Sequence, residues 1–207
     1  GGPGRPGSAT FVTVRLLPTG APDPAFSGDG LVLIPLGPGT GIGIGAAAVR
    51  RGPHGTTLVA GTDLTAHGTP RGAVIRLWPN GALDRRFGSG GVARVARAGR
   101  DIHFTAMDGD RRGRIVLAGT ARTPDGILVR LRRGGKRDRK FGNGGLTYPV
   151  LGRPPGGSPI FTSLNAVDVS GLKPVVVGSA AGPGPLDRTA GGTLYRGSFA
   201  LTVSRYG

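Results

Sequence analysis

The chain of 207 residues contains no cysteine, no glutamate and no glutamine. Without cysteine it has no disulfide, no thiol nucleophile and no cysteine-ligated zinc. All eleven acidic residues are aspartates, and only three lysines accompany 24 arginines. Because Glu, Gln and Lys are good helix formers for solvent-facing positions, their scarcity favours an all-β fold. No apolar run approaches the ~20 residues of a membrane-spanning helix.

Glycine (42 residues) and proline (18 residues) are abundant, a content that by itself is typical of disordered chains. Periodic apolar runs and a hydrophobic content of 37% nevertheless supply material for a core, so we expect a folded chain rich in loops. The sequence starts at Gly1 without methionine, for which a removed secretion signal is one explanation.

One segment recurs along the chain without a gap, starting at residues 13, 74 and 128. In each copy an Arg-Leu pair is followed by a glycine, then an aspartate, and three residues later a phenylalanine. A partial fourth copy, FALTVSRYG, ends the chain, with Arg205 and Tyr206 in the Arg-Leu places. A period in this range indicates a solenoid, a propeller or an array. The three complete copies are TVRLLPTGAPDPAFSGDGL, VIRLWPNGALDRRFGSGGV and LVRLRRGGKRDRKFGNGGL.

The recurring residues predict a structural turn. A short aspartate side chain bonds nearby backbone N–H groups, the phenylalanine fixes the loop to the body, and the glycines permit a sharp return into a new strand. The turn motif predicted in this way comprises Asp23, Asp84, Asp138, Phe26, Phe87, Phe141, Gly91 and Gly145.

Between the turn motifs, strand-like runs alternate with turn signals, four to a repeat, which is the arrangement of β-propeller blades. We therefore predict an all-β fold of three four-stranded repeats plus an extra N-terminal strand, with at least ten strands and no helix longer than two turns. The run LVLIPL (31–36) predicts a strand covered on both faces. Residues 1–10 are expected to form a flexible arm, and 11–207 a single repeat domain with repeats at about 13–73, 74–127 and 128–206.

The pattern RL-x-x-x-G-x-x-D-x-x-FG-x-GG, followed by an apolar strand pair ending in VAG or LAG, resembles the delta-60 repeat family. The resemblance extends from about Thr13 to Tyr206. It implies β-propeller-like blades of the kind found in large secreted or surface proteins of bacteria. The first copy departs from the pattern after Phe26, where Ser27 and Gly28 occupy the two positions that follow the phenylalanine.

Residues with catalytic or metal-binding chemistry are scattered, so we expect no catalytic site. The repeated aspartates, with Asp29 nearby, allow calcium binding, but one carboxylate per turn favours turn capping, and we expect no cofactor. His54, His67 and His103 lack metal-ligand spacing. His103 lies two residues after Asp101, which is compatible with a general-base pair, but no G-x-S-x-G nucleophile motif accompanies them. The glycine-rich 37–45 lacks the Lys-Ser/Thr pair of a phosphate loop.

The net charge of +16 is concentrated between residues 85 and 140, which carry sixteen Lys and Arg against five Asp. Such a field favours acidic partners, although the same turn is far less charged in the other copies. The candidate anion-binding residues are Arg130, Arg132, Arg133, Lys136, Arg137, Arg139 and Lys140.

Three functions remain open at this point. The first is a non-enzymatic structural or assembly protein, extracellular or on the cell surface, that self-associates through blade faces or strand edges. The second is a binding module for anionic polymers, polysaccharide or nucleic acid. The third is a propeller enzyme acting on sugars or lactones. Neither end of the sequence resembles a polar cap. We therefore expect either that the chain is a piece of a longer propeller or that identical chains associate, as a pair with six blades or as a head-to-tail fibre.

Overall fold

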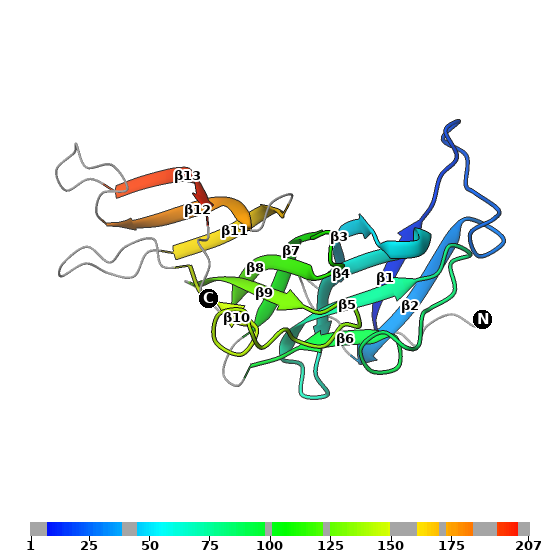
Figure 1. The fold of residues 1–207 in the computed structure, drawn as a ribbon, viewed down its shortest axis with the longest axis horizontal. Coiled ribbons are helices and arrows are strands. Elements are labelled where there is room, and N and C mark those ends of the chain that lie inside the picture. Colours follow the sequence, from blue (N-terminus) through cyan, green and yellow to red (C-terminus); the bar gives the residue numbers. More distant parts are fainter. Residues whose placement is uncertain are drawn as a thin grey trace. The chain divides into compact units, whose positions relative to one another are not determined.

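The computed structural model describes residues 8–38, 45–97, 101–121, 125–149, 161–169, 173–183 and 194–202. These residues form thirteen β-strands and one short 3₁₀ turn, Pro53–Gly55 (Figure 1). The all-β prediction is confirmed, and so are the expected strand number and, within the described residues, the lack of a long helix. No helix in this part of the chain has the length and apolar character needed to cross a membrane.

The chain divides into two compact units, residues 1–104 and 105–207. The first unit contains two antiparallel sheets, one with two strands and one with four. The two-stranded sheet is formed by β1 (Ser8–Val14) and β2 (Leu31–Pro38). The four-stranded sheet has the order β3 (Gly45–Arg51), β4 (Thr57–Leu64), β5 (Pro70–Leu77) and β6 (Val92–Val95).

The boundary between the compact units falls within β7, whose residues up to Phe104 belong to the first unit. One sheet has the order β10-β9-β8-β7 and the last has the order β11-β12-β13. The strands of the four-stranded sheet are β7 (Ile102–Gly109), β8 (Ile115–Ala121), β9 (Asp125–Leu131) and β10 (Leu146–Thr147). Those of the last sheet are β11 (Phe161–Asp168), β12 (Val175–Pro183) and β13 (Leu194–Thr202).

The strands divide among the sheets differently from the expected three four-stranded repeats and one extra strand. The turn motif lies inside a sheet, where it joins the third strand to the fourth: Ile75 pairs with Val92 across one motif and Val129 with Leu146 across another. Two complete four-stranded sheets result, flanked along the sequence by a sheet of two strands and a sheet of three. β1 is accordingly equivalent to β5 and β9, and β2 to β6 and β10.

The first strand begins at Ser8, so the last three residues of the expected flexible arm pair with β2. The remainder of that arm, residues 1–7, lies outside the described residues, as do 39–44 of the glycine-rich connection and 203–207 of the partial fourth copy.

The core of the first unit lies between the two-stranded sheet and the four-stranded sheet. Phe11 of β1 and Phe26 of the first turn motif pack in one buried cluster with Val59, Ile75 and Leu77 of the second sheet. Each fully buried side chain of this size stabilises the folded state by roughly 1.5–3 kcal/mol. The two sheets therefore stack face to face.

The prediction that β2 is covered on both faces was wrong. Val32 and Leu36 are buried against the four-stranded sheet, whereas Leu31 and Leu33 are 37% and 57% exposed on the opposite face. A continuous apolar run is compatible both with a strand covered on two faces and with a strand that has one apolar face exposed, as β2 has within the described residues.

The core of the second unit repeats this arrangement. Val116 and Ala118 of β8 and Phe141 of the third turn motif pack with Leu164 of β11 and Val176 of β12. The four-stranded sheet β7–β10 thus covers one face of the sheet β11–β13, as the two-stranded sheet covers β3–β6 in the first unit.

Equivalent glycines allow the first two strands of a sheet to approach closely. Gly61 of β4 lies opposite Ala46, next to a break in register, and Gly178 of β12 lies opposite Leu164, next to a second such break. A Cβ atom at Gly61 would lie 1.9 Å from the Gly45 carbonyl oxygen, and one at Gly178 would lie 2.0 Å from the Ser163 carbonyl oxygen. The bulge therefore requires glycine at this position.

We expect Gly61→Ala to lower the free energy of unfolding by about 2 kcal/mol, because backbone atoms have to move to admit the methyl group. Chemical denaturation at a fixed protein concentration measures this loss. Gly134→Ala is the control, since its Cβ would meet no atom within 4 Å. Equal stability of the two variants would contradict the requirement for glycine.

Candidate functional site

The arginine, aspartate and phenylalanine of each turn motif contact one another. The Arg Nε atom donates to one carboxylate oxygen at 2.7 Å in Arg15–Asp23, 2.8 Å in Arg76–Asp84 and 2.9 Å in Arg130–Asp138. The other carboxylate oxygen accepts the backbone N–H of the residue two positions further along, at 2.9, 3.1 and 3.3 Å. Each aspartate thus holds both its turn and the strand that leads into it.

The same arginines cover the motif phenylalanines. The guanidinium carbon lies 4.7, 4.8 and 4.6 Å from the ring centroid in the pairs Arg15–Phe26, Arg76–Phe87 and Arg130–Phe141. The three rings are at most 7% exposed. Gly91 and Gly145 have φ values of +99° and +100°, which permit the return into the fourth strand. The geometry is that of a folding element, repeated three times.

The histidines lie at separate places in the first unit. His54 and His67 occupy the β3–β4 and β4–β5 turns, and His103 of β7 has its Nδ1 atom 3.3 Å from the Thr62 hydroxyl. Among the described residues no group of three or more His or Asp side chains is placed to hold a metal ion. The arrangement of these residues offers no assembled nucleophile, base and orienting group.

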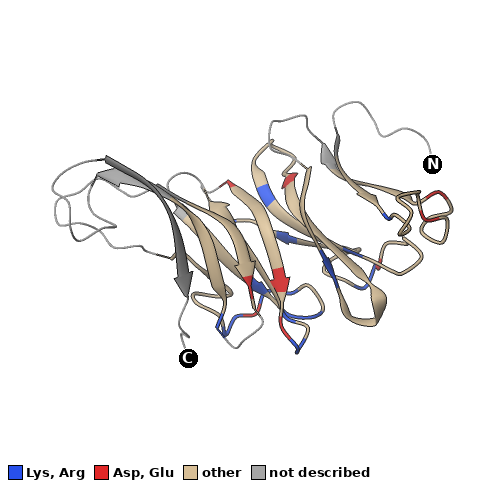
Figure 2. Ribbon diagram, turned by 90° about the horizontal axis from the view of Figure 1, so that it is seen from above, with Lys and Arg blue, Asp and Glu red and all other residues tan. Residues whose placement is uncertain are grey.

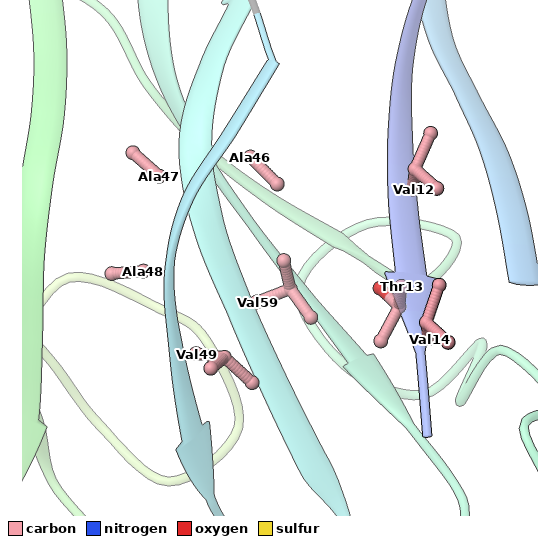
Figure 3. Close-up of a pocket in the computed structure, with 8 residues that line it drawn as sticks. All are labelled: Val12, Thr13, Val14, Ala46, Ala47, Ala48, Val49 and Val59. Carbon is pink, nitrogen blue, oxygen red and sulfur yellow. The ribbon is translucent and has the colours of Figure 1, made fainter. Parts of the chain in front are cut away.

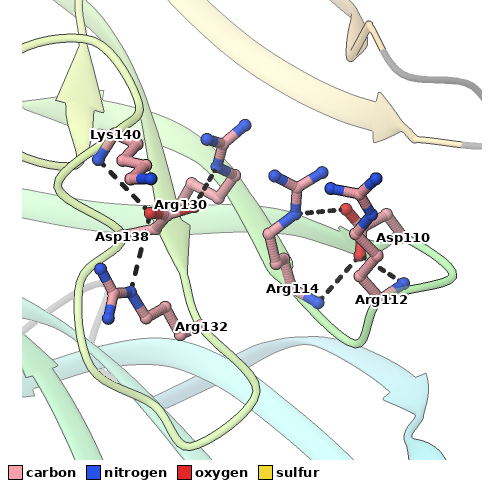
Figure 4. A network of polar contacts seen from close by, with 7 residues as sticks. All are labelled: Asp110, Arg112, Arg114, Arg130, Arg132, Asp138 and Lys140. Atoms are coloured by element: carbon pink, nitrogen blue, oxygen red, sulfur yellow. Dashed lines mark hydrogen bonds and ion pairs between the residues drawn. The ribbon is translucent and has the colours of Figure 1, made fainter.

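One end of the sheet β7–β10 is strongly basic, and we call it the basic end (residues 110–114 and 130–140). The β7–β8 turn and the β9–β10 turn lie there together, because alternate turns of an antiparallel sheet share an end. A Cβ atom at Gly113 would lie 3.3 Å from the side chain of Arg133, so the two turns touch. Figure 2 shows the Lys and Arg positions along these turns, and Figure 4 shows the polar contacts.

Two aspartates organise the basic end. Asp110 accepts the backbone N–H groups of Arg112 and Arg114, both at 2.9 Å, and its second oxygen pairs with Arg114 Nε at 2.5 Å. Burial acts to raise the pKa of Asp110, but the hydrogen bonds and charge of Arg114 outweigh it and hold that pKa below its ordinary value. The carboxylate therefore stays charged at neutral pH, and its contribution to stability is lost only as the pH falls through the lowered pKa.

Arg130 differs from the other predicted anion-binding residues because its side chain is largely buried. Its side chain is 16% exposed and pairs with Asp138. Burial lowers the pKa of Arg130, and the nearby positive charge of Arg114 acts in the same direction against the opposing effect of Asp138. The other six predicted residues, with Arg111 and Arg112 of the neighbouring turn, are exposed.

An apolar groove of about 230 Å³ lies in the first unit between β1 and β3 (Figure 3). Val12, Thr13 and Val14 of β1 line it on one side, with 46–49 of β3 and Val59 on the other. The Thr13 Oγ1 atom is buried and has no hydrogen-bond partner in the described part of the chain. Apolar residues around the groove are well exposed: Val12 (51%), Val14 (53%) and Val49 (68%).

A buried charge cluster lies at the end of the sheet β3–β6 opposite its turn motif. Asp63 is fully buried, and one of its oxygens contacts Arg71 Nη2 and Arg94 Nε, both at 2.8 Å. Arg94 also donates to the carbonyl of Leu36 at 2.9 Å, which links β2 to β6. In the sheet β7–β10 the place of Asp63 is taken by Ala121, so the fold does not require this cluster.

Sequence reasoning missed the groove, the Asp63 cluster and the arginines of the β7–β8 turn. It identified the motif arginines as repeat anchors but not their contacts with Asp and Phe. A signal was present for those contacts, since Arg and Asp keep a separation of eight residues in all three copies.

Comparison with known proteins identifies one matching family. Residues 53–87 match the model described as "Domain of unknown function (DUF5122) beta-propeller". The match extends from the β3–β4 turn through β4 and β5 to Phe87, so part of this chain is similar to a β-propeller repeat family that carries no assigned activity. No curated protein and no solved structure matches the chain significantly.

Proposed function

We propose that this chain is a non-enzymatic repeat protein of the delta-60 type, secreted or displayed on the cell surface, whose function is assembly with further copies of itself. The β-propeller match and the three-fold turn motif support a repeat scaffold. The arginine and aspartate side chains of the motif are used in ion pairs and turn caps, which favours a structural role over catalysis.

The observation that carries the proposal is the open face beside β3. Ala46 and Val49 of β3 are equivalent to Leu164 and Val167 of β11, because both pairs flank the glycine-dependent bulge. Leu164 is 1% exposed, and Val167 packs against the core of the second unit. Val49, in contrast, is 68% exposed.

The difference in exposure has a structural cause. In the second unit β11 is covered by the sheet β7–β10, in which β8 lies beside β9 and contributes Val116 and Ala118 to the shared core. In the first unit β1 takes the place of β9, and within the described residues no strand occupies the place of β8. The groove between β1 and β3 therefore has the environment of a missing strand.

We propose that the occupant is the outer edge of β13 from a second copy. The free edge of β1 is the one that β5 and β9 use to pair with β4 and β8. β13 follows β12 in the place of a third strand, and its outer edge carries no strand in the described part of the chain. Both edges are open to a further strand in the described part of the chain, and edge strands readily pair with another chain.

Sedimentation velocity at micromolar concentration tests the assembly. We expect species larger than the 20.9 kDa chain, and we expect Val14→Asp to shift them towards the monomer, since a charge in the groove would be buried by the incoming strand. Ala82→Asp, at an exposed turn position, is the matched control and should leave the assembly unchanged. A compact monomer with a sharp melting transition, or equal effects of the two variants, would refute the proposal.

A further inference from the structure

The basic end of the sheet β7–β10 carries more charge than its fold requires. It contains ten Lys and Arg residues and two aspartates, a formal excess of eight positive charges. Asp110 pairs with Arg114 and Asp138 with Arg130, whose side chains are 25% and 16% exposed, and the exposed Arg132 lies 3.7 Å from the second oxygen of Asp138. The remaining cations belong to exposed residues: Arg111, Arg112, Arg132, Arg133, Lys136, Arg137, Arg139 and Lys140.

The other sheets provide an internal comparison. Residues 52–56 and 76–86 occupy the equivalent end of the sheet β3–β6 and have a formal charge of +2. Residues 15–25 of the first turn motif have a formal charge of zero. Since all three turn motifs keep the same ion pair and the same buried ring, the additional charge of the basic end has no role in the turn itself.

The charge is gathered from two turns that are far apart in the sequence. The β7–β8 turn contributes Arg111 and Arg112, and Asp110 holds this turn through two backbone N–H groups and the Arg114 side chain. In the β9–β10 turn Asp138 accepts the backbone N–H of Lys140. Arg139 and Lys140 therefore lie on a backbone that this hydrogen bond holds in place. A surface of cations on two rigid turns binds an anion with a smaller loss of conformational entropy than a flexible basic tail.

The basic end contains no exposed aromatic ring. Phe141 is 7% exposed and lies under Arg130, and Arg132 stands where the equivalent turn of β3–β6 has the half-exposed Trp78. Single-stranded nucleic acids are usually held by bases stacked on aromatic rings. Duplex DNA is usually read by a helix or a two-stranded ribbon in a groove. Arginine forks bind carboxylate and phosphate oxygens in bidentate geometry, and a sulfate group presents the same tetrahedral arrangement of oxygens.

From these observations we infer that the basic end is a binding site for an anionic polysaccharide, a chain of sugars bearing carboxylate or sulfate groups. Recognition is by charge along the polymer, so affinity falls as the salt concentration rises. This site lies in the second compact unit and does not depend on the proposed assembly through β1.

Heparin serves as the probe, and two double variants change equivalent positions by the same charge. Arg139→Glu/Lys140→Glu alters the basic end, and Arg85→Glu/Arg86→Glu alters the two matching positions in the turn of β3–β6. All four residues are exposed. At constant salt we expect the first variant to bind heparin about tenfold more weakly, and the second to stay within about twofold of the unaltered protein.

Melting curves establish whether both double variants fold. If Arg139→Glu/Lys140→Glu does not fold, Arg111→Gln/Lys136→Gln replaces it, because that variant only neutralises two exposed cations. Equal loss of binding in the matched pair would show attraction by net charge alone and overturn the site. Tighter binding to a DNA duplex than to heparin would overturn the polysaccharide. Lack of binding to heparin at low salt would overturn the inference altogether.

Discussion

Phe87→Ala should lower the free energy of unfolding by about 3–5 kcal/mol, which is the usual cost of removing a buried aromatic side chain. Phe87 is fully buried, and the guanidinium of Arg76 covers its ring at 4.8 Å. Truncation therefore leaves a cavity and also removes a cation–π contact. Because Arg76 keeps its ion pair with Asp84, the loss reports the ring and not the carboxylate.

Chemical denaturation at a fixed protein concentration measures the effect, since association would make stability depend on concentration. Trp78→Ala, two residues beyond Arg76, is the control because its side chain is 39% exposed. Phe87→Leu should recover most of the lost stability if volume is the main factor. A Phe87→Ala variant as stable as the Trp78→Ala variant would show that the ring does not anchor the turn.

The turn motif could be predicted from the sequence because each copy contains all of its parts within a short segment. Asp84 and Phe87 are three residues apart, and the capping bond that Asp84 accepts comes from Arg86, only two residues after it. Local hydrogen bonding and the preference of glycine for positive φ act within this distance. The all-β fold followed equally directly from the missing helix formers and the alternation of strands and turns.

The division of the strands into sheets could not be predicted in the same way. A repeat has the same period wherever its starting point is set, so the sequence does not show which strands begin and end a blade. The pairing of Val129 with Leu146 settles this, because it places the turn motif between two strands of one sheet. That pairing depends on contacts across the motif, and the amino-acid sequence carries no separate signal for it.

The basic end was predicted only in part, for a related reason. Arg130 and its neighbours form a visible run, but Arg111 and Arg112 join them only because two turns of one sheet share an end. The run also grouped Arg130 with the exposed cations, although its partner Asp138 is eight residues away. Local charge density shows where cations are abundant, and the fold decides which of them the protein itself neutralises.

Asp63→Ala should lower the free energy of unfolding by about 3 kcal/mol, the lower part of the range for removing one partner of a buried ion pair. Asp63 is fully buried, while Arg71 and Arg94 are 23% and 30% exposed and can recover some hydration. The substitution leaves two guanidiniums facing each other without the carboxylate between them. It also weakens the link that Arg94 makes to the Leu36 carbonyl, so part of the loss should appear as exposure of the core between β2 and the sheet β3–β6.

A double-mutant cycle separates the charge effect from the loss of packing. If the ion pair carries the stability, Arg94→Met should restore part of what Asp63→Ala removes, because it takes away an unpaired cation and keeps the length of the side chain. Asp29→Ala is the control, since that carboxylate lies at an exposed position and bonds only the nearby N–H of Leu31 in the described structure; it should cost well under half as much. Losses that simply add for Asp63→Ala and Arg94→Met would mean that the two residues stabilise the fold independently and that the ion pair between them contributes no stability.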